Sequence, residues 1–174
     1  KYDAKRQVIA GVGLGGPSRA LLARAKLLKL GDTEVKDPVT MLSTASAGAF
    51  AEEGYAGNVG YGVLRRFTLV FDYPHEQVFL EPDTAFAGAD VYDRSGLWVE
   101  RGDKGWELVE VVPEGPAALA GLKTGDVVVA IDGQKATDVK LSDLRERLRA
   151  APGTKQRLKL SDGRERTPVL KDLI

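Results

Sequence analysis

Short apolar runs separated by turn residues dominate the pattern along the chain. In the first 82 residues each run is about as long as a β-strand and is bounded by Gly, Pro, Asp or Asn. The runs lie at Val8–Val12, Ala25–Leu30, Val39–Leu42, Thr68–Phe71 and Gln77–Leu80. Two hairpins are predicted, one turning at Gly31-Asp32 and one turning at Asp72–Glu76.

The later part of the chain alternates more regularly and predicts further strands with two helices. Pro116 and Gly121 bracket a short helix, because proline suits a first helical turn and glycine a C-terminal cap. A second helix is expected over Leu141–Ala150, ended by Pro152-Gly153. Strands are expected at Leu97–Glu100, Trp106–Val112, Asp126–Ile131, Gln156–Leu160 and Thr167–Leu170.

These elements together predict a mainly β fold of the α+β class. The composition changes near residue 83, from a Gly- and Ala-rich part to one with cleaner alternation. The predicted division is therefore a first domain at 1–82, a linker at 83–92 and a second domain at 93–174. A chain of 174 residues is long enough for two small domains, each with its own core.

Charge and composition exclude several classes of function. The chain carries 25 basic and 25 acidic residues, and this zero net charge argues against a nucleic-acid binder. It has no cysteine and one histidine, which excludes disulfides, thiolate nucleophiles and the usual Cys or His metal sites. No metal and no cofactor is predicted. No apolar run approaches the ~20 residues of a membrane span.

A Ser-His-Asp triad would have to use His75, the single histidine. No G-x-S-x-G turn accompanies it anywhere in the chain. Because Pro74 and charged residues surround His75, we expect it to be an exposed turn residue.

The segment Gly11–Gly16 fits G-x-G-x-x-G and allows two interpretations. In one it is a dinucleotide-binding turn between a strand and a helix over Ser18–Ala25. In the other it belongs to a glycine-rich β-hairpin. The hairpin is favoured, because paired short strands follow and about 80 residues are too few for a dinucleotide-binding fold.

The run Val112–Gly133 combines Pro113, Gly115-Pro116-Ala117-Ala118, Ala120-Gly121-Leu122 and Gly125-Asp126. This run closely resembles the bacterial type of PDZ domain. The resemblance implies a module that binds extended peptides, usually protein C-termini, as an added strand between a strand and the second helix.

Within this resemblance, Ser95-Gly96-Leu97 match the loop that receives a ligand's terminal carboxylate. Ser95 stands where the family has an apolar residue, which predicts a shallower or more polar terminal pocket. The other candidate peptide-binding residues are Val99 on the strand and Leu141, Arg145 and Leu148 on the helix. The alternative is that the leucines only complete the core, that Arg145 is a solvated charge, and that Trp98 and Trp106 are packing residues.

The run Tyr55–Tyr73 carries a glycine turn, a helical turn and Asp72-Tyr73-Pro74. It resembles the later half of a retropepsin-like aspartic peptidase domain, and bacterial members of that family often carry a PDZ domain behind it. The resemblance implies a substrate-covering flap at Gly11, Gly13, Gly15 and Gly16 and a homodimer through the peptidase domain. It also suggests export to the periplasm or cell envelope.

The catalytic motif Asp-Thr/Ser-Gly is absent, since Asp32-Thr33 and Asp83-Thr84 are not followed by glycine. The resemblance therefore implies that this chain is the C-terminal part of a longer protein whose catalytic Asp precedes Lys1. The first hypothesis is an aspartic endopeptidase whose PDZ domain binds substrate peptides, with this chain alone inactive. The alternative is a non-catalytic peptide-binding scaffold with a degenerate peptidase-like domain.

Overall fold

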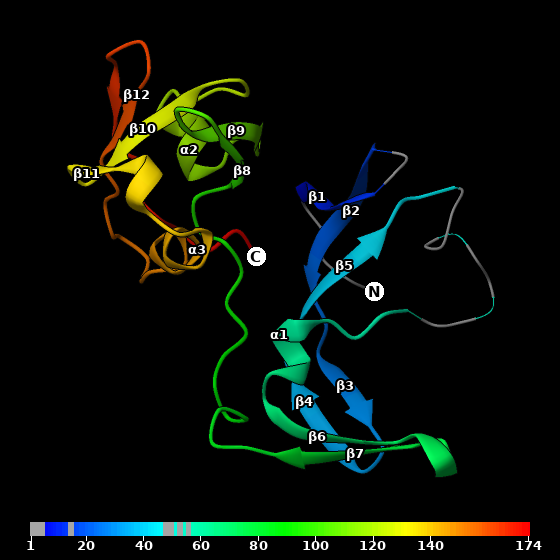
Figure 1. The fold of residues 1–174 in the computed structure, drawn as a ribbon. Helices are drawn as coiled ribbons and strands as arrows, with labels where there is room; N and C mark the ends of the chain where they lie inside the picture. The colour runs from blue at the N-terminus through cyan, green and yellow to red at the C-terminus, as the bar shows by residue number, and fades with distance from the viewer. Residues whose placement is uncertain (1–5, 14–15, 47–50, 52–53, 55–56) are drawn as a thin grey trace.

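The computed structural model describes residues 6–13, 16–46, 51, 54 and 57–174. It confirms a mainly β fold of the α+β class, with short helices between the strands. Strands β1 to β7 form an N-terminal module, and strands β8 to β13 form a C-terminal module (Figure 1). None of the helices in the described residues has the length and apolarity needed to cross a membrane.

The N-terminal module is built from one small sheet and two hairpins. The three-stranded sheet has the order β1-β2-β5, and the hairpins pair β3 with β4 and β6 with β7. The bounds are β1 Arg6–Gly13, β2 Gly16–Arg24, β3 Leu27–Leu30, β4 Thr33–Lys36, β5 Val39–Ser43, α1 Tyr61–Leu64, β6 Phe67–Asp72 and β7 Gln77–Pro82. Both predicted hairpins are therefore confirmed.

The described glycines of this segment lie in the β1–β2 hairpin, with Gly13 paired to Gly16. The stretch Ser18–Ala25 lies largely in strand β2, where a dinucleotide-binding fold would need a helix. The hairpin interpretation is thus confirmed and the dinucleotide-binding one is wrong. Gly15, a proposed flap residue, lies outside the described residues.

The Asp72-Tyr73-Pro74 segment forms the turn between β6 and β7. A 3-10 helix, η2 (Tyr73–His75), begins there, and the Asp72 carboxylate accepts a hydrogen bond from the His75 backbone amide. Aspartate followed by proline at a helix start is a general capping arrangement. The segment that carried the peptidase resemblance therefore has a purely local structural explanation.

The C-terminal module is a sheet with the order β13-β12-β10-β9-β8, and β11 pairs with β10. The bounds are β8 Leu97–Gly102, β9 Gly105–Val111, α2 Pro116–Leu119, β10 Val127–Ile131, β11 Gln134–Lys135, η3 Ala136–Asp138, α3 Leu141–Leu148, β12 Leu158–Leu160 and β13 Glu165–Arg166. The strand predicted at Thr167–Leu170 is wrong. Pro168 in its middle has no amide to donate, and only one bridge, Lys155 to Val169, forms there.

The core of the C-terminal module lies between the sheet and helix α3. Its largest buried side chains include Trp106, Leu108, Ile131 and Leu158. Gly105 is required beside this core, because a Cβ there would lie 2.1 Å from the Val128 carbonyl oxygen. The close approach lets β9 pack flat against the neighbouring strand.

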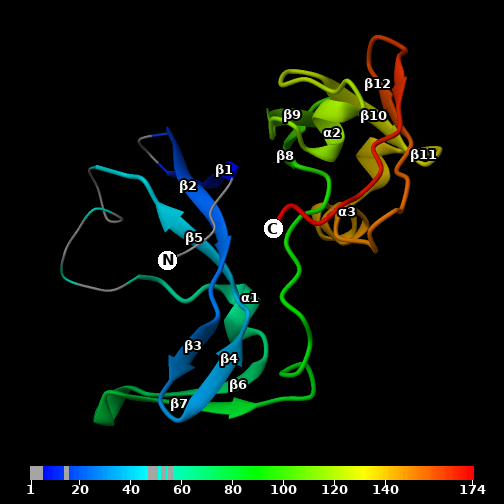
Figure 2. The ribbon, with the colours of Figure 1, turned by 180° about the vertical axis from the view of Figure 1, so that it is seen from behind.

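A second apolar cluster joins the two modules. It contains Val8 and Leu22 from the N-terminal sheet, together with Val112 and Leu173 from the C-terminal module. Seen from behind, the C-terminal end of the chain lies between the two modules (Figure 2). The last residues therefore contribute to holding the modules together.

Candidate functional site: the groove between β8 and α3

An open groove of about 590 Å³ lies beside β8 and the start of α3. Strand β8 is the last strand in the sheet order, so its outer edge pairs with no described strand. The groove is lined by Gly11, Val12, Trp98, Val99, Glu100, Arg101, Trp106, Lys140, Leu141 and Arg145. This combination gives an apolar floor with charged groups along its rim.

Arg101 fixes one end of the groove. Its guanidinium lies 4.0 Å from the centre of the Trp106 ring and donates to the carbonyl oxygens of Ala136, at 3.1 Å, and Val139, at 2.7 Å. These contacts tie β8 to the segment that leads into α3. A planar guanidinium can stack and donate at once, which an ammonium cannot do in the same way.

Arg94 ties the loop before β8 to the C-terminal end of α3. Its side chain donates to the carbonyl oxygens of Arg149 and Ala150 just after α3, and it pairs with Asp172 at 2.6 Å. A cation at this position also complements the negative end of the helix dipole. With Arg101, it connects β8 and the loop before it to the segments on either side of α3.

The N-terminal module forms part of the groove wall. Gly11 and Val12, next to an irregularity in the pairing of β1 with β2, line the groove beside Trp98. Val12 is 56% exposed although it is apolar. The sequence did not indicate that this hairpin would reach the second module.

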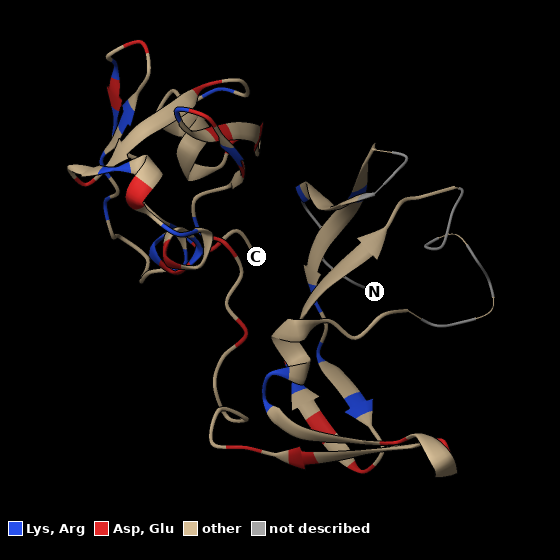
Figure 3. Ribbon diagram, viewed as in Figure 1, with Lys and Arg blue, Asp and Glu red and all other residues tan. Residues whose placement is uncertain are grey.

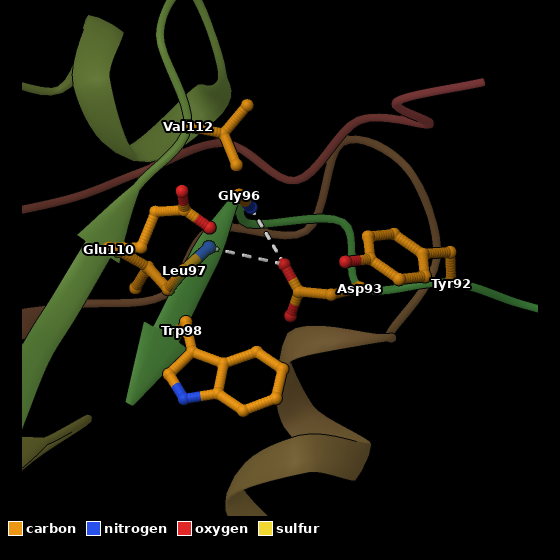
Figure 4. A pocket seen from close by; sticks show the side chains of 7 residues that line it. All are labelled: Tyr92, Asp93, Gly96, Leu97, Trp98, Glu110 and Val112. Carbon is orange, nitrogen blue, oxygen red and sulfur yellow. Dashed lines mark hydrogen bonds between the residues drawn. The ribbon is translucent and has the colours of Figure 1, made fainter. Parts of the chain in front are cut away.

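The loop before β8 is organised by Asp93. Its Oδ1 accepts hydrogen bonds from the backbone amides of Ser95 at 2.9 Å and Gly96 at 2.7 Å, and from the Ser95 hydroxyl at 2.8 Å. The Leu97 amide makes a longer contact of 3.4 Å to the same oxygen (Figure 4). Burial raises the pKa of Asp93, and these four hydrogen bonds oppose the increase.

Tyr92 and Glu110 lie against the same loop (Figure 4). Burial, followed by the charges of Asp93 and Glu110, raises the pKa of Tyr92 to about 12. Glu110 itself is occupied: it accepts from the Ile9 amide at 2.8 Å and pairs with Arg19 at 2.6 Å. Two carboxyl groups, those of Asp93 and Glu110, therefore lie beside this loop.

The structure separates the predicted peptide-binding residues into two sets. Val99, Leu141 and Arg145 line the groove. Leu148 is 3% exposed and belongs to the core, and Ser95 is fully buried with its hydroxyl bonded to Asp93. Gly96 and Leu97 line the small cavity around Asp93 and not the groove.

Several groove residues were not among the predicted ones. Trp98 and Trp106 were considered as packing residues, and Trp106 does belong to the core at 2% exposure, but both also line the groove. A pairing irregularity between Trp98 and Val99 interrupts strict alternation, so a side chain expected on the opposite face reaches the groove. Asp93 could have been recognised from the sequence, because aspartate two residues before serine often accepts from following amides.

Residues 107–161 match the model of the PDZ domain family. The C-terminal module therefore contains a PDZ domain. Members of this family bind peptide C-termini by adding a strand to an exposed sheet edge. In this chain β8 provides such an edge.

Among the curated proteins no match was found. Similar solved structures include the HtrA-type protease AlgW with decapeptide (17% identity, TM-score 0.44) and the serine endoprotease from Yersinia pestis (15% identity, TM-score 0.45). Both alignments cover 100% of this chain, and 62% and 64% of those proteins respectively. The chain therefore spans just under two thirds of their length.

These findings correct the predicted enzyme class. The similar solved structures are described as HtrA-type proteases and as a serine endoprotease, and not as aspartic peptidases. The prediction of an aspartic-type endopeptidase with a retropepsin-like domain is therefore wrong, and the homodimer inferred from that domain is not shown. At this level of similarity the serine protease activity of those proteins does not transfer to this chain.

His75 has the environment of a surface residue. Its ring nitrogen lies 2.8 Å from Asp72, and its side chain is 71% exposed at the β6–β7 turn. Within the described residues, no serine hydroxyl makes a hydrogen bond with His75. This part of the chain therefore lacks an assembled Ser-His-Asp triad.

Charged residues of both signs are distributed along both modules (Figure 3). Across the described residues, no group of three or more His, Cys, Asp or Glu side chains has the arrangement of a metal site. The groove between β8 and α3 is therefore the feature of the described structure best suited to binding another molecule.

Proposed function

We propose that this chain binds extended peptides as a strand added to the free edge of β8, in the groove facing α3. The observation that carries the proposal is the unpaired outer edge of β8 beside that groove, in the same sheet as the strands of the segment 107–161 that matches the PDZ family. Unpaired amides and carbonyls on such an edge can bond to an incoming backbone. Side-chain pockets then select the sequence.

The lining of the groove supports a preference for certain peptides. Trp98, Val99 and Leu141 offer apolar surface, and Lys140 and Arg145 place two cations at the helix side of the rim. Arg145 is exposed and makes no salt bridge to a described residue. A bound peptide with apolar residues facing the floor and acidic residues facing Arg145 would complement this surface.

We also propose that three parts of the chain have different roles. Residues 93–174 form the binding unit, residues 83–92 the linker, and residues 1–82 a scaffold that supplies part of the groove wall through Gly11 and Val12. No catalytic role is assigned to the N-terminal module.

Fluorescence polarisation with a library of labelled peptides tests the proposal on the full chain. Arg145→Glu should weaken the binding of acidic peptides at least tenfold, about 1.4 kcal/mol, because it replaces attraction by repulsion at the rim. Lys159→Glu is the matched control. It makes the same charge change at an exposed position of β12 that does not line the groove.

Comparing the two variants distinguishes a local effect of charge at the groove from a long-range effect of net charge on peptide binding. Equal weakening by both would show that net charge, and not the groove, determines binding. Absence of binding by the unmodified chain across the library would contradict the proposed function altogether.

A further inference from the structure

The amides that PDZ domains offer to a terminal carboxylate are already occupied in this chain. Sequence matching assigned that role to the Gly96 and Leu97 amides. In the structure the Gly96 amide donates to Asp93 Oδ1 at 2.7 Å, and the Leu97 amide donates to the Ser95 hydroxyl at 3.1 Å. The chain's own carboxylate thus occupies the place of a ligand's terminal group.

The space around these amides is also too small for another carboxylate. The cavity there has a volume of about 10 Å³, which is no more than one water molecule needs. Its wall includes Asp93, Gly96, Leu97 and Glu110 (Figure 4). A terminal carboxylate could enter only by displacing the Asp93 side chain and breaking its four hydrogen bonds.

Electrostatic repulsion also opposes the entry of a terminal carboxylate. Asp93 and Glu110 both line the cavity, so an incoming carboxylate would meet two acidic side chains. Arg19, which pairs with Oε1 of Glu110, does not line the cavity. Acidic groups at short distance repel strongly where water is excluded.

The groove itself stays open next to this closed loop. Val99, Leu141 and Arg145 line the large groove and none of them lines the small cavity. A peptide backbone can therefore pair with β8 without placing its end against Gly96. A chain that continues beyond the groove avoids the repulsion, because an internal peptide unit carries no charge.

We infer that the groove binds internal segments of polypeptide chains in preference to free C-termini, with Asp93 as the residue that sets this specificity. The inference rests on the proposed function, since it concerns which peptides the β8–α3 groove selects. It departs from the preference for C-termini that PDZ domains usually show.

The test compares three labelled forms of one peptide selected from the binding library. The first ends in a free carboxylate, the second in an amide, and the third continues for four further residues. For the unmodified chain we expect the amidated and extended forms to bind at least as tightly as the free acid. Tenfold or greater preference for the free acid would overturn the inference.

Two variants at Asp93 complete the test. Asp93→Ala frees the Ser95 and Gly96 amides and removes a charge, so affinity for the free acid should rise at least tenfold relative to the amide form. Asp93→Asn keeps an acceptor oxygen for the amides and should retain most of the block, which also controls for a fold disturbed by alanine. If Asp93→Ala leaves the ratio of the two affinities unchanged, Asp93 does not set specificity.

The outcomes distinguish this inference from the proposed function. If none of the three forms binds the unmodified chain, peptide binding itself fails, and the inference fails with it. If all bind but the free acid is preferred tenfold, the groove assignment stands and only the role of Asp93 is rejected.

Discussion

Arg19 and Glu110 form an ion pair of 2.6 Å that joins the N-terminal sheet to strand β9 of the PDZ domain. The second oxygen of Glu110 accepts from the Ile9 backbone amide at 2.8 Å, in a buried position. One carboxylate therefore satisfies a charged group and a buried donor of the other module. These contacts keep the β1–β2 hairpin beside the groove.

The two partners of this pair should contribute unequally to stability. Glu110→Ala leaves the buried Ile9 amide without an acceptor, and should lower the free energy of unfolding by about 2–3 kcal/mol. Arg19→Ala removes a half-exposed partner and should cost less than about 1 kcal/mol. Urea unfolding of both variants measures the difference. Equal losses would show that the ion pair, and not the amide, is the important contact.

Two glycines of the PDZ domain should respond differently to alanine. At Gly105 the new Cβ would meet the Val128 carbonyl oxygen, so the expected loss is on the order of 3 kcal/mol or more. At Gly125, also at positive φ, nothing lies within 4 Å, and only backbone strain of about 1 kcal/mol is expected. Thermal unfolding of the two variants provides the comparison. A loss at Gly125 as large as that at Gly105 would contradict the steric explanation.

Tyr92 should lose its proton at a higher pH than an ordinary tyrosine does. Its pKa is raised to about 12, so the folded chain keeps this proton between pH 10 and 12 while the unfolded chain loses it. Stability should therefore fall as the pH rises through that interval. Absorbance titration of the phenolate should show a step near pH 12 that disappears in Tyr92→Phe. Tyr73→Phe, a change at an 83% exposed side chain, should leave this step in place.

Arg101 should not be replaceable by lysine. Arg101→Lys keeps the charge but loses the fork that reaches the Ala136 and Val139 carbonyl oxygens while stacking on Trp106. The expected loss is about 1–3 kcal/mol of unfolding free energy, with weaker peptide binding because the groove is no longer braced. Arg157→Lys is the control, since that exposed guanidinium makes no hydrogen bond to a described residue. Similar losses in both variants would show a general effect of arginine replacement.

Local signals made much of the PDZ domain predictable. Pro116 begins α2, and Gly121, at positive φ, follows it within two residues, because these residue types restrict or extend the backbone wherever they occur. The strand at Thr167–Leu170 was wrong because its apolar residues pack without forming a ladder around Pro168. The sequence pattern shows that such a segment is apolar. Whether it forms a strand depends on hydrogen bonds to another segment of the chain, which the pattern does not show.

Contacts between distant segments could not be predicted. Glu110 binds the amide of Ile9, 101 positions earlier, and nothing in the sequence around either residue indicates the other. The extension of the groove by Val12 has the same origin. Asp93 differs, since its hydrogen-bond partners follow within four residues. It was missed because the PDZ resemblance assigned roles only to the next residues, Ser95, Gly96 and Leu97.

The chain contains two tryptophans, and both line the groove. Trp98 is partly exposed there, whereas Trp106 is 2% exposed beneath the Arg101 guanidinium. The tryptophan emission of this protein therefore originates at the groove. A ligand that covers Trp98 should shift that emission to shorter wavelength. Binding to the groove can therefore be followed by tryptophan fluorescence without a label on the peptide or the protein.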